Sequence, residues 1–98
     1  MSNKALIITS INVTDPAKYE NYKALSGPAM AANGGRFVVR GGKMEVLEGE
    51  WPRPRVVVVE FDSFEAAKAA YHSVQYAAAR QERLGAADFN MIVVEGVN

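Results

Sequence analysis

Three short segments of this chain are apolar at consecutive positions, so both faces of each segment carry hydrocarbon. The segments are Ala5–Ile8, Val56–Val59 and Met91–Val94. Valine and isoleucine favour β-strands, and a strand directs successive side chains to opposite faces of its sheet. An antiparallel sheet with one face in water normally alternates apolar and polar residues. The pattern therefore predicts a sheet that is covered on both faces, which limits the folds open to 98 residues.

Helices are predicted between the strands. The first has Pro16 at its opening position, after a capping side chain at position 14 or 15. The pair Gly27-Pro28 should kink or interrupt this helix, because proline has no N–H to donate. Ser63 and Ser73 can cap two further helices. The predicted helices span residues 16–33, 64–72 and 74–84, and the predicted strands span residues 4–13, 37–40, 43–46, 55–61 and 89–97.

The stretch RFVVRGGKMEV contains a glycine pair between two alternating runs. A two-residue hairpin turn needs positive φ at both positions, which glycine adopts freely. With Gly41 and Gly42 as the turn, Arg40 faces Lys43, and Arg36 shares their face. The order of elements then predicts an α+β fold, a ferredoxin-like plait with an antiparallel sheet and an extra hairpin. One domain should span residues 1–98.

Helices in such a plait cover one face of the sheet and leave the other bare. A second copy of the same sheet is the simplest cover, since two-fold symmetry brings identical apolar patches together. Burial of apolar surface contributes about 25 cal/mol per Å², so even a modest patch favours association. The sequence therefore predicts a homodimer.

The composition excludes several classes of function. Eleven basic and eleven acidic residues cancel, so no long-range field attracts nucleic acid or an anionic membrane. The chain has no cysteine and one histidine, His72, so we expect no metal site and no cofactor. The apolar run Ala5–Ile8 is too short for a signal peptide or a membrane span, which predicts a cytoplasmic protein.

Arg40, Tyr71 and His72 are the candidate site residues. Arg40 can bind a carboxylate through two parallel hydrogen bonds, although a solvated charged edge also explains Arg36, Arg40 and Lys43. Histidine changes its charge near neutral pH, which suits His72 to proton transfer, but the helix dipole also favours a histidine at a helix end. Tyr71 can hydrogen-bond a ligand or simply pack.

Four segments carry a resemblance to a known family. They are TDPAKYENY, GGRFVVRGG, MEVLEGEWPRPRVVVVEFDSFEAAKAAY and SVQYAAAR followed by GAADFNMIVVEG. Over nearly the whole chain, their order resembles the domain-of-unknown-function family numbered thirteen-thirty, in the dimeric α+β barrel superfamily. The resemblance implies two ferredoxin-like sheets that meet as a dimeric barrel, and no agreed activity. Superfamily relatives include cofactor-free monooxygenases, lactone isomerases and haem-binding proteins. His72 stands where members often have an acid, so any role for it would be particular to this chain.

Two functions follow as expectations. The first is a cofactor-free enzyme, isomerase-like or monooxygenase-like, acting on a small oxygen-bearing organic molecule between helices and sheet. Arg40 would hold an anionic group of that molecule, His72 would move a proton and Tyr71 would shape the pocket. The alternative is a non-catalytic small-molecule-binding or interaction module that uses the dimer as a scaffold. An enclosed polar cavity with Arg40 or His72 favours the enzyme.

Overall fold

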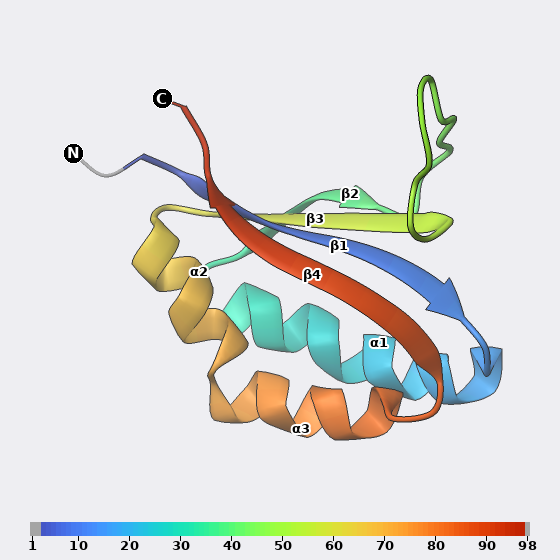
Figure 1. Ribbon diagram of the computed structural model, residues 1–98. Helices are drawn as coiled ribbons and strands as arrows, with labels where there is room; N and C mark the ends of the chain where they lie inside the picture. Colours follow the sequence, from blue (N-terminus) through green and yellow to red (C-terminus); the bar gives the residue numbers. More distant parts are fainter. Residues whose placement is uncertain (1–2, 98) are drawn as a thin grey trace.

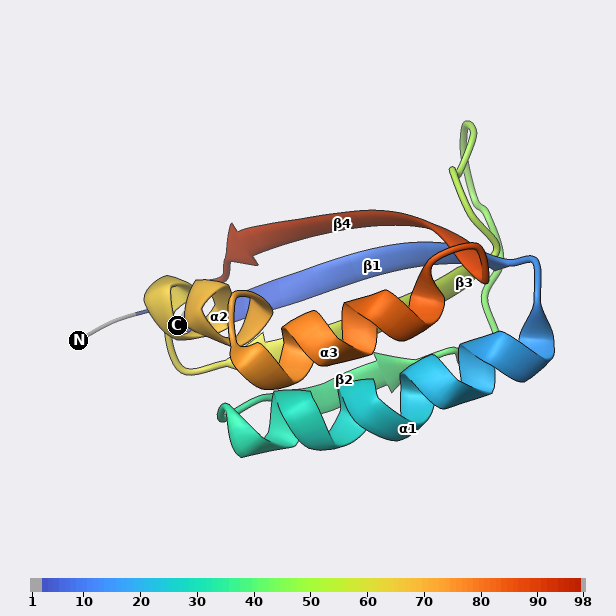
Figure 2. The same cartoon turned by 90° about the horizontal axis from the view of Figure 1, so that it is seen from below.

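The computed structural model describes residues 3–97, in which four antiparallel strands form one sheet with three helices against one face (Figure 1). The strands are β1 (Ala5–Val13), β2 (Arg36–Arg40), β3 (Arg55–Phe61) and β4 (Ala87–Glu95), and the helices are α1 (Pro16–Ala32), α2 (Phe64–Tyr71) and α3 (Val74–Arg83). The strand order is β2-β3-β1-β4. Figure 2, seen from the helix side, shows α1 and α3 side by side in front of the sheet, with α2 at one end. The predicted ferredoxin-like α+β fold is confirmed.

The helices begin at their capping residues, as predicted. The side chain of Asp15 caps α1, Ser63 caps α2 and Ser73 caps α3, each by accepting a hydrogen bond from a backbone N–H three residues ahead. The helix is not interrupted at Gly27-Pro28, because α1 continues through both residues. Pro28 lies on the exposed side of α1, where water can hydrogen-bond the carbonyl that loses its N–H partner.

The hairpin predicted across Gly41 and Gly42 is also wrong. β2 pairs with β3, and residues 41–54 form a projecting loop without strand structure. Gly41 has a φ of 71°, but Gly42 is not among the positive-φ glycines of the described chain, so a turn that needs two such residues does not form. Arg40 lies opposite Val57 rather than Lys43. A two-stranded hairpin is marginally stable alone, whereas β3 offers β2 a place in a larger sheet.

A β-bulge in β2 decides which face Arg40 occupies. Phe37 lies opposite Val59 and Arg40 opposite Val57, with the register shift between Phe37 and Val39. An extra residue in one strand lets two side chains three positions apart share a face. Arg40 therefore joins Phe37 on the helix side of the sheet. The prediction that Arg36 and Arg40 share a face is wrong.

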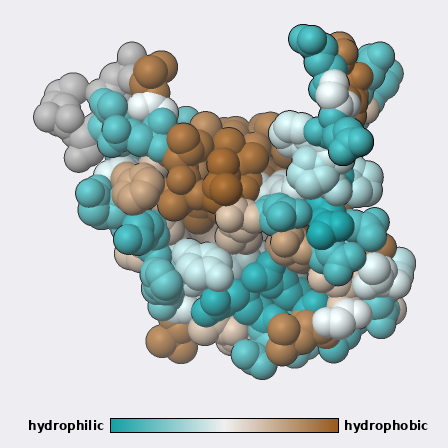
Figure 3. All heavy atoms as spheres, viewed as in Figure 1, coloured by the Kyte–Doolittle hydropathy of each residue, from teal (hydrophilic) through white to brown (hydrophobic). Residues whose placement is uncertain are grey.

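The sheet face turned away from the helices carries an apolar row that crosses all four strands. Val39 lies opposite Val58, Val58 opposite Ile8, and Ile8 opposite Ile92. Val39 is 40% exposed and Ile92 58% exposed. Figure 3 shows apolar surface gathered over β4 and the strands behind it, between the chain ends and the projecting loop. These residues are the apolar outer face that the sequence predicted.

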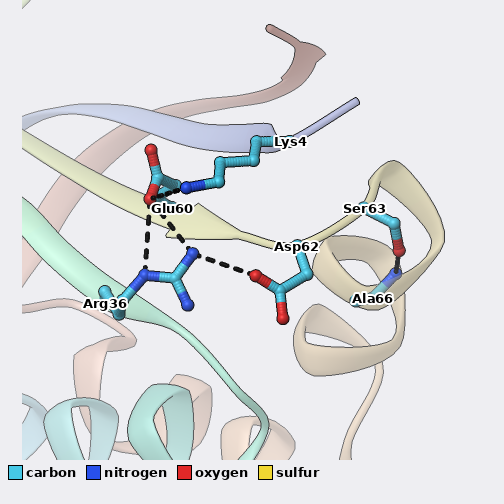
Figure 4. Close-up of polar contacts among 6 residues, drawn as sticks. All are labelled: Lys4, Arg36, Glu60, Asp62, Ser63 and Ala66. Atoms are coloured by element: carbon cyan, nitrogen blue, oxygen red, sulfur yellow. Dashed lines mark hydrogen bonds and ion pairs between the residues drawn. The ribbon is translucent and has the colours of Figure 1, made fainter. Parts of the chain in front are cut away.

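Polar contacts flank this apolar row. Arg36 donates to Glu60 at 3.0 Å and to Asp62 at 3.2 Å, and Lys4 lies 3.7 Å from Glu60 (Figure 4). The hydrogen bonds to Glu60, and next those to Asp62, raise the pKa of Arg36. Arg36 is therefore engaged in ion pairs on the outer face.

No helix within residues 3–97 combines the length and apolar character needed to cross a membrane.

Candidate functional site

A small cavity lies between the helix side of the sheet and helices α1 and α3. Five aromatic residues line it together with three cationic residues. The aromatic residues are Tyr19, Tyr22, Phe37, Tyr76 and Phe89, and the cationic residues are Lys23, Arg40 and Arg55. Within residues 3–97, no acidic side chain lines this space. Its volume is about 30 Å³, which holds about one or two water molecules. We call it the aromatic cavity.

Two tyrosine hydroxyls meet at the wall of the aromatic cavity. Tyr22 of α1 and Tyr76 of α3 are buried, and their hydroxyl oxygens lie 2.7 Å apart. Burial raises the pKa of both phenols, so both stay protonated at neutral pH. One hydroxyl donates to the other, and the accepting hydroxyl keeps its own proton to donate elsewhere. The pair suits hydrogen-bond donation rather than proton abstraction.

The three cations of the aromatic cavity differ in their partners. The Nζ atom of Lys23 lies 3.3 Å from Oε1 of Glu20 and forms an ion pair with it. Arg40 and Arg55 form no ion pair with any residue between 3 and 97. Arg40 is exposed and Arg55 is partly exposed, so neither guanidinium group is occupied by an acid of the described chain and both can contact an anion.

Both guanidinium groups lie over aromatic rings. The Cζ atom of Arg40 lies 4.2 Å from the centre of the Phe37 ring, and that of Arg55 lies 5.8 Å from the centre of the Tyr19 ring. Arginine stacks well on aromatic faces and keeps its N–H groups free. The Nε atom of Arg55 is buried and makes no hydrogen bond within the described chain. Buried donors are normally paired, so this N–H is an exception within the described chain.

Two glycines leave room for these guanidinium groups. A Cβ atom at Gly27, in the middle of α1, would lie 2.9 Å from Nη2 of Arg40. A Cβ atom at Gly41 would meet the guanidinium group of Arg55. Glycine inside a helix costs about 0.5–1 kcal/mol relative to alanine. The close approach of Arg40 explains why a residue without a side chain stands at position 27 of the helix.

Helix α3 adds two more arginines that contact aromatic rings. The Cζ atom of Arg83 lies 4.0 Å from the centre of the Phe89 ring. Arg80 lies over Tyr71, and its Nη1 donates to the Tyr71 hydroxyl at 2.9 Å. Nε of Arg80 and Nη1 of Arg83 are buried without a hydrogen-bond partner among residues 3–97. The helix side of the fold is therefore rich in cationic donors.

Tyr71 and His72 lie in a different pocket from Arg40. They line a groove of about 220 Å³ between α2 and β4. Their rings are 5.1 Å apart and nearly perpendicular, and His72 is the exposed C-terminal cap of α2. Ile7 and Met91 line both this groove and the aromatic cavity. The structure thus brings Tyr71 together with His72, and Arg40 together with Arg55, but it does not unite the two pairs.

Arg55 and the tyrosine pair were not predicted as site residues. Arg55 could have been identified from the sequence, because it shares strand parity with Val57 and Val59, whose side chains face the helices. The meeting of Tyr22 with Tyr76 depends on how α1 packs against α3, which no local pattern encodes. Within the described residues, no group of three histidine, aspartate or glutamate side chains forms a candidate metal site.

Comparison with solved structures shows the same fold in several proteins. The RPA0582 protein of unknown function from Rhodopseudomonas palustris aligns over 100% of this chain and 85% of its own, with a TM-score of 0.77 and 20% identity. SnoaB, a cofactor-independent oxygenase from Streptomyces nogalater, aligns over 99% and 96%, with a TM-score of 0.66 and 14% identity. A dimeric ferredoxin-like protein of unknown function from Thermobifida fusca aligns over 98% and 93%, with a TM-score of 0.64 and 13% identity. At these identities the likeness concerns the fold.

Sequence comparison adds a family. The profile of a family described as Domain of unknown function (DUF1330) matches residues 4–97. No curated protein sequence is significantly similar to the chain.

Proposed function

The chain belongs to the DUF1330 family, and we propose that this protein is a homodimeric, cofactor-free enzyme acting on a small oxygen-bearing organic anion bound in the aromatic cavity. The observation that carries the proposal is the charge of the cavity lining, which has three cations and, among residues 3–97, no acid. Cationic groups beside low-dielectric walls favour an anionic ligand over a neutral or cationic one.

The chemistry of the lining supports turnover of a molecule that ionises easily. Arg40 and Arg55 would stabilise the anion of a phenol or an enol, and the Tyr22–Tyr76 pair would donate a hydrogen bond to one of its oxygens. Such an anion is electron-rich enough to isomerise or to react with oxygen without a cofactor. The fold shared with SnoaB, a cofactor-independent oxygenase, supports the oxygenase form of the proposal by analogy.

The size of the aromatic cavity sets a condition on binding. About 30 Å³ is less than an aromatic ring occupies, so a ligand enters only as long side chains at the mouth move outward. Arg40 is exposed, and Lys23 and Arg55 are partly exposed. Exposed side chains change rotamer within nanoseconds, so this movement does not limit entry.

His72 and Tyr71 remain proposed residues for proton transfer and ligand contact, now at the groove between α2 and β4. Because the groove and the aromatic cavity are separate, we expect His72→Gln to leave anion binding in the cavity unchanged. A loss of turnover in His72→Gln, with binding intact, would assign His72 a part in the reaction. Equal turnover in the variant and the wild type would show that His72 takes no part in the reaction.

The outer face of the sheet supports the homodimer. The row of Val39, Val58, Ile8 and Ile92 is apolar across four strands, with polar contacts beside it. An apolar centre with a polar rim is the usual anatomy of a protein interface. A second copy of the same face fits it, because a two-fold axis places like patches against each other.

The alternative is a non-catalytic binding module, and one observation favours it. No aspartate, glutamate or histidine among residues 3–97 lines the aromatic cavity, so no side chain there is suited to proton abstraction near neutral pH. A protein that only binds an organic anion would need the same cations and aromatic rings.

Binding and turnover of the same compounds separate the two functions. The purified protein is screened by thermal shift against small phenols, enols and aromatic carboxylates. Each compound that binds is then incubated with protein in air, while oxygen uptake, product mass and chromatographic retention are followed, because an isomerisation changes only the retention. Consumption of a bound compound supports the enzyme, and binding without consumption supports the alternative. If no anionic compound raises the melting temperature, both are wrong. Arg36→Gln, which alters a cation on the outer face, is the control for loss of charge alone.

A further inference from the structure

Arg40 and Arg55 lie close together on one face of two paired strands. Arg40 lies opposite Val57, and Arg55 precedes Val57 by two residues on β3. Diagonal neighbours of this kind on one sheet face are about 7–8 Å apart at Cα. Both side chains line the aromatic cavity. A single oxyanion group placed between them can therefore contact both guanidinium groups.

The surroundings of this pair are shaped to receive it. Gly27 leaves space for the guanidinium group of Arg40 against α1, and Gly41 leaves space for that of Arg55. The register shift in β2 turns Arg40 to the helix side of the sheet. Neither arginine has an acidic partner among residues 3–97, and Nε of Arg55 is buried without an acceptor there. The two glycines give the side chains space, the bulge places Arg40 on the same face as Arg55, and the unpaired Nε of Arg55 is a free donor. All three features suit the binding of an anion by these two arginines.

We propose that Arg40 and Arg55 together bind the carboxylate of a planar aromatic acid, and that Gly27 is required for Arg40 to reach it. The carboxylate would lie between the guanidinium groups, and the ring of the acid would take the space beside Phe37 and Tyr19. This inference rests on the proposed function, because it names the ligand class of the same cavity. A carboxylate is favoured over a phosphate because it is flat and small, which suits a narrow space between rings and matches the planar fork of arginine.

Benzoate and benzamide test the charge requirement. They have nearly the same shape, but only benzoate is an anion. By isothermal titration calorimetry, wild-type protein should bind benzoate roughly tenfold to a hundredfold more tightly than benzamide, as expected for hydrogen bonds to a charged group. Phenyl phosphate is a third ligand in the series. Tighter binding of phenyl phosphate than of benzoate would overturn the choice of a carboxylate.

Variants then test the two arginines. Arg55→Gln and Arg40→Gln should each weaken benzoate binding by roughly tenfold or more, while benzamide binding changes little. Arg36→Gln is the matched control, because Arg36 lies on the outer face in ion pairs with Glu60 and Asp62, and it should bind benzoate as the wild type does. Benzoate binding that is unchanged in both cavity variants would overturn the proposal.

Gly27→Ala tests how the site is built. The added methyl group should displace the guanidinium group of Arg40 and weaken benzoate binding, while the melting temperature rises or stays the same. In an Arg40→Gln background the same change should cause no further loss of affinity. A further loss in that background would show that Gly27 acts by another route and would overturn its assignment.

The outcomes separate this inference from the proposed function. If neither benzoate, benzamide nor phenyl phosphate binds, while other small phenols or enols do, the carboxylate clamp is wrong and the proposed function stands. If benzoate and benzamide bind equally, the clamp is again wrong. If no organic anion of any class binds, both are wrong.

Discussion

At the scale of single residues, Gly27 shows how a local cost can serve a site. A helix interior is a poor place for glycine, and Pro28 follows it directly. The structure places the guanidinium group of Arg40 where a side chain at position 27 would stand. The sequence therefore carries a residue of low helix propensity at a point of α1 that Arg40 approaches closely.

Gly27→Ala should stabilise the protein by about 0.5–1 kcal/mol. The reason is that alanine favours the helix, and the only close atoms belong to the flexible end of Arg40, which can move into solvent. Urea unfolding monitored by circular dichroism measures the change. A loss of stability would mean that Arg40 is fixed in place and cannot yield.

The buried tyrosine pair makes stability depend on alkaline pH. Burial raises the pKa of Tyr22 and of Tyr76 above the ordinary value of 10.0. An unfolded chain can ionise these phenols near that pH, whereas the folded chain holds them protonated. Their contribution to stability is therefore present below about pH 10 and is lost as the pH rises towards the folded values.

Melting temperatures from pH 8 to 11 test this linkage. Wild-type protein should lose stability more steeply above about pH 10 than the double variant Tyr22→Phe/Tyr76→Phe, which lacks both phenols of the pair. The single variant Tyr22→Phe should cost about 1–3 kcal/mol at neutral pH, because the hydroxyl of Tyr76 loses its partner. Parallel pH profiles for wild type and double variant would contradict the account.

At the scale of elements, β2 and the loop that follows it determine the site. Strands β1, β3 and β4 could be predicted closely from their apolar runs, and the helices from their capping residues, since both signals are local. The strand that pairs with β2 could not be predicted from the sequence. A glycine pair between alternating runs is compatible with a local hairpin, and it is equally compatible with the end of a strand followed by a loop. The pairing energy of the whole sheet decides between them. The bulge, which places Arg40 on the helix side, depends on that pairing.

The two glycines after β2 should respond differently to substitution. Gly41 has a φ of 71°, so Gly41→Ala should destabilise the fold by about 1–2 kcal/mol. Gly42 has no neighbouring heavy atom within 4 Å of an added Cβ, so Gly42→Ala should change stability by less than about 0.5 kcal/mol. Thermal unfolding of both variants measures the contrast. Equal losses at the two positions would restore the hairpin that the sequence predicted.

At the scale of the whole molecule, the outer face of the sheet leads to a prediction about assembly. Val58 lies in the middle of the apolar row, with Ile8 and Val39 opposite it on either side. We expect sedimentation at micromolar concentration to give twice the chain mass for wild-type protein. Val58→Lys should give a monomer or insoluble protein, because a charge at the centre of an apolar interface is costly. A well-behaved wild-type monomer would contradict the dimer.

The fold and the site differ in how much the sequence could reveal. The order of the strands and helices could be predicted from local patterns, and this order leads to the α+β plait. Arg40 was a candidate from its chemistry and lines the aromatic cavity, although the sheet face predicted for it was wrong. Tyr71 and His72 were predicted as part of the same site, but they lie beside another groove, because α2 contacts the sheet at a different place from α1 and α3. Sites assembled from several elements require the packing, which the sequence pattern does not supply.

The central claim is that the aromatic cavity binds an organic anion through its unpaired arginines, and an NMR titration tests it directly. Benzoate is added to isotope-labelled protein while the Nε–Hε signals of the arginines are followed. The account predicts that the signals of Arg40 and Arg55 shift and reach a plateau as the site fills, while the signal of Arg36 stays in place. A titration that leaves Arg40 and Arg55 unmoved, or that shifts only residues of the groove beside His72, would contradict it.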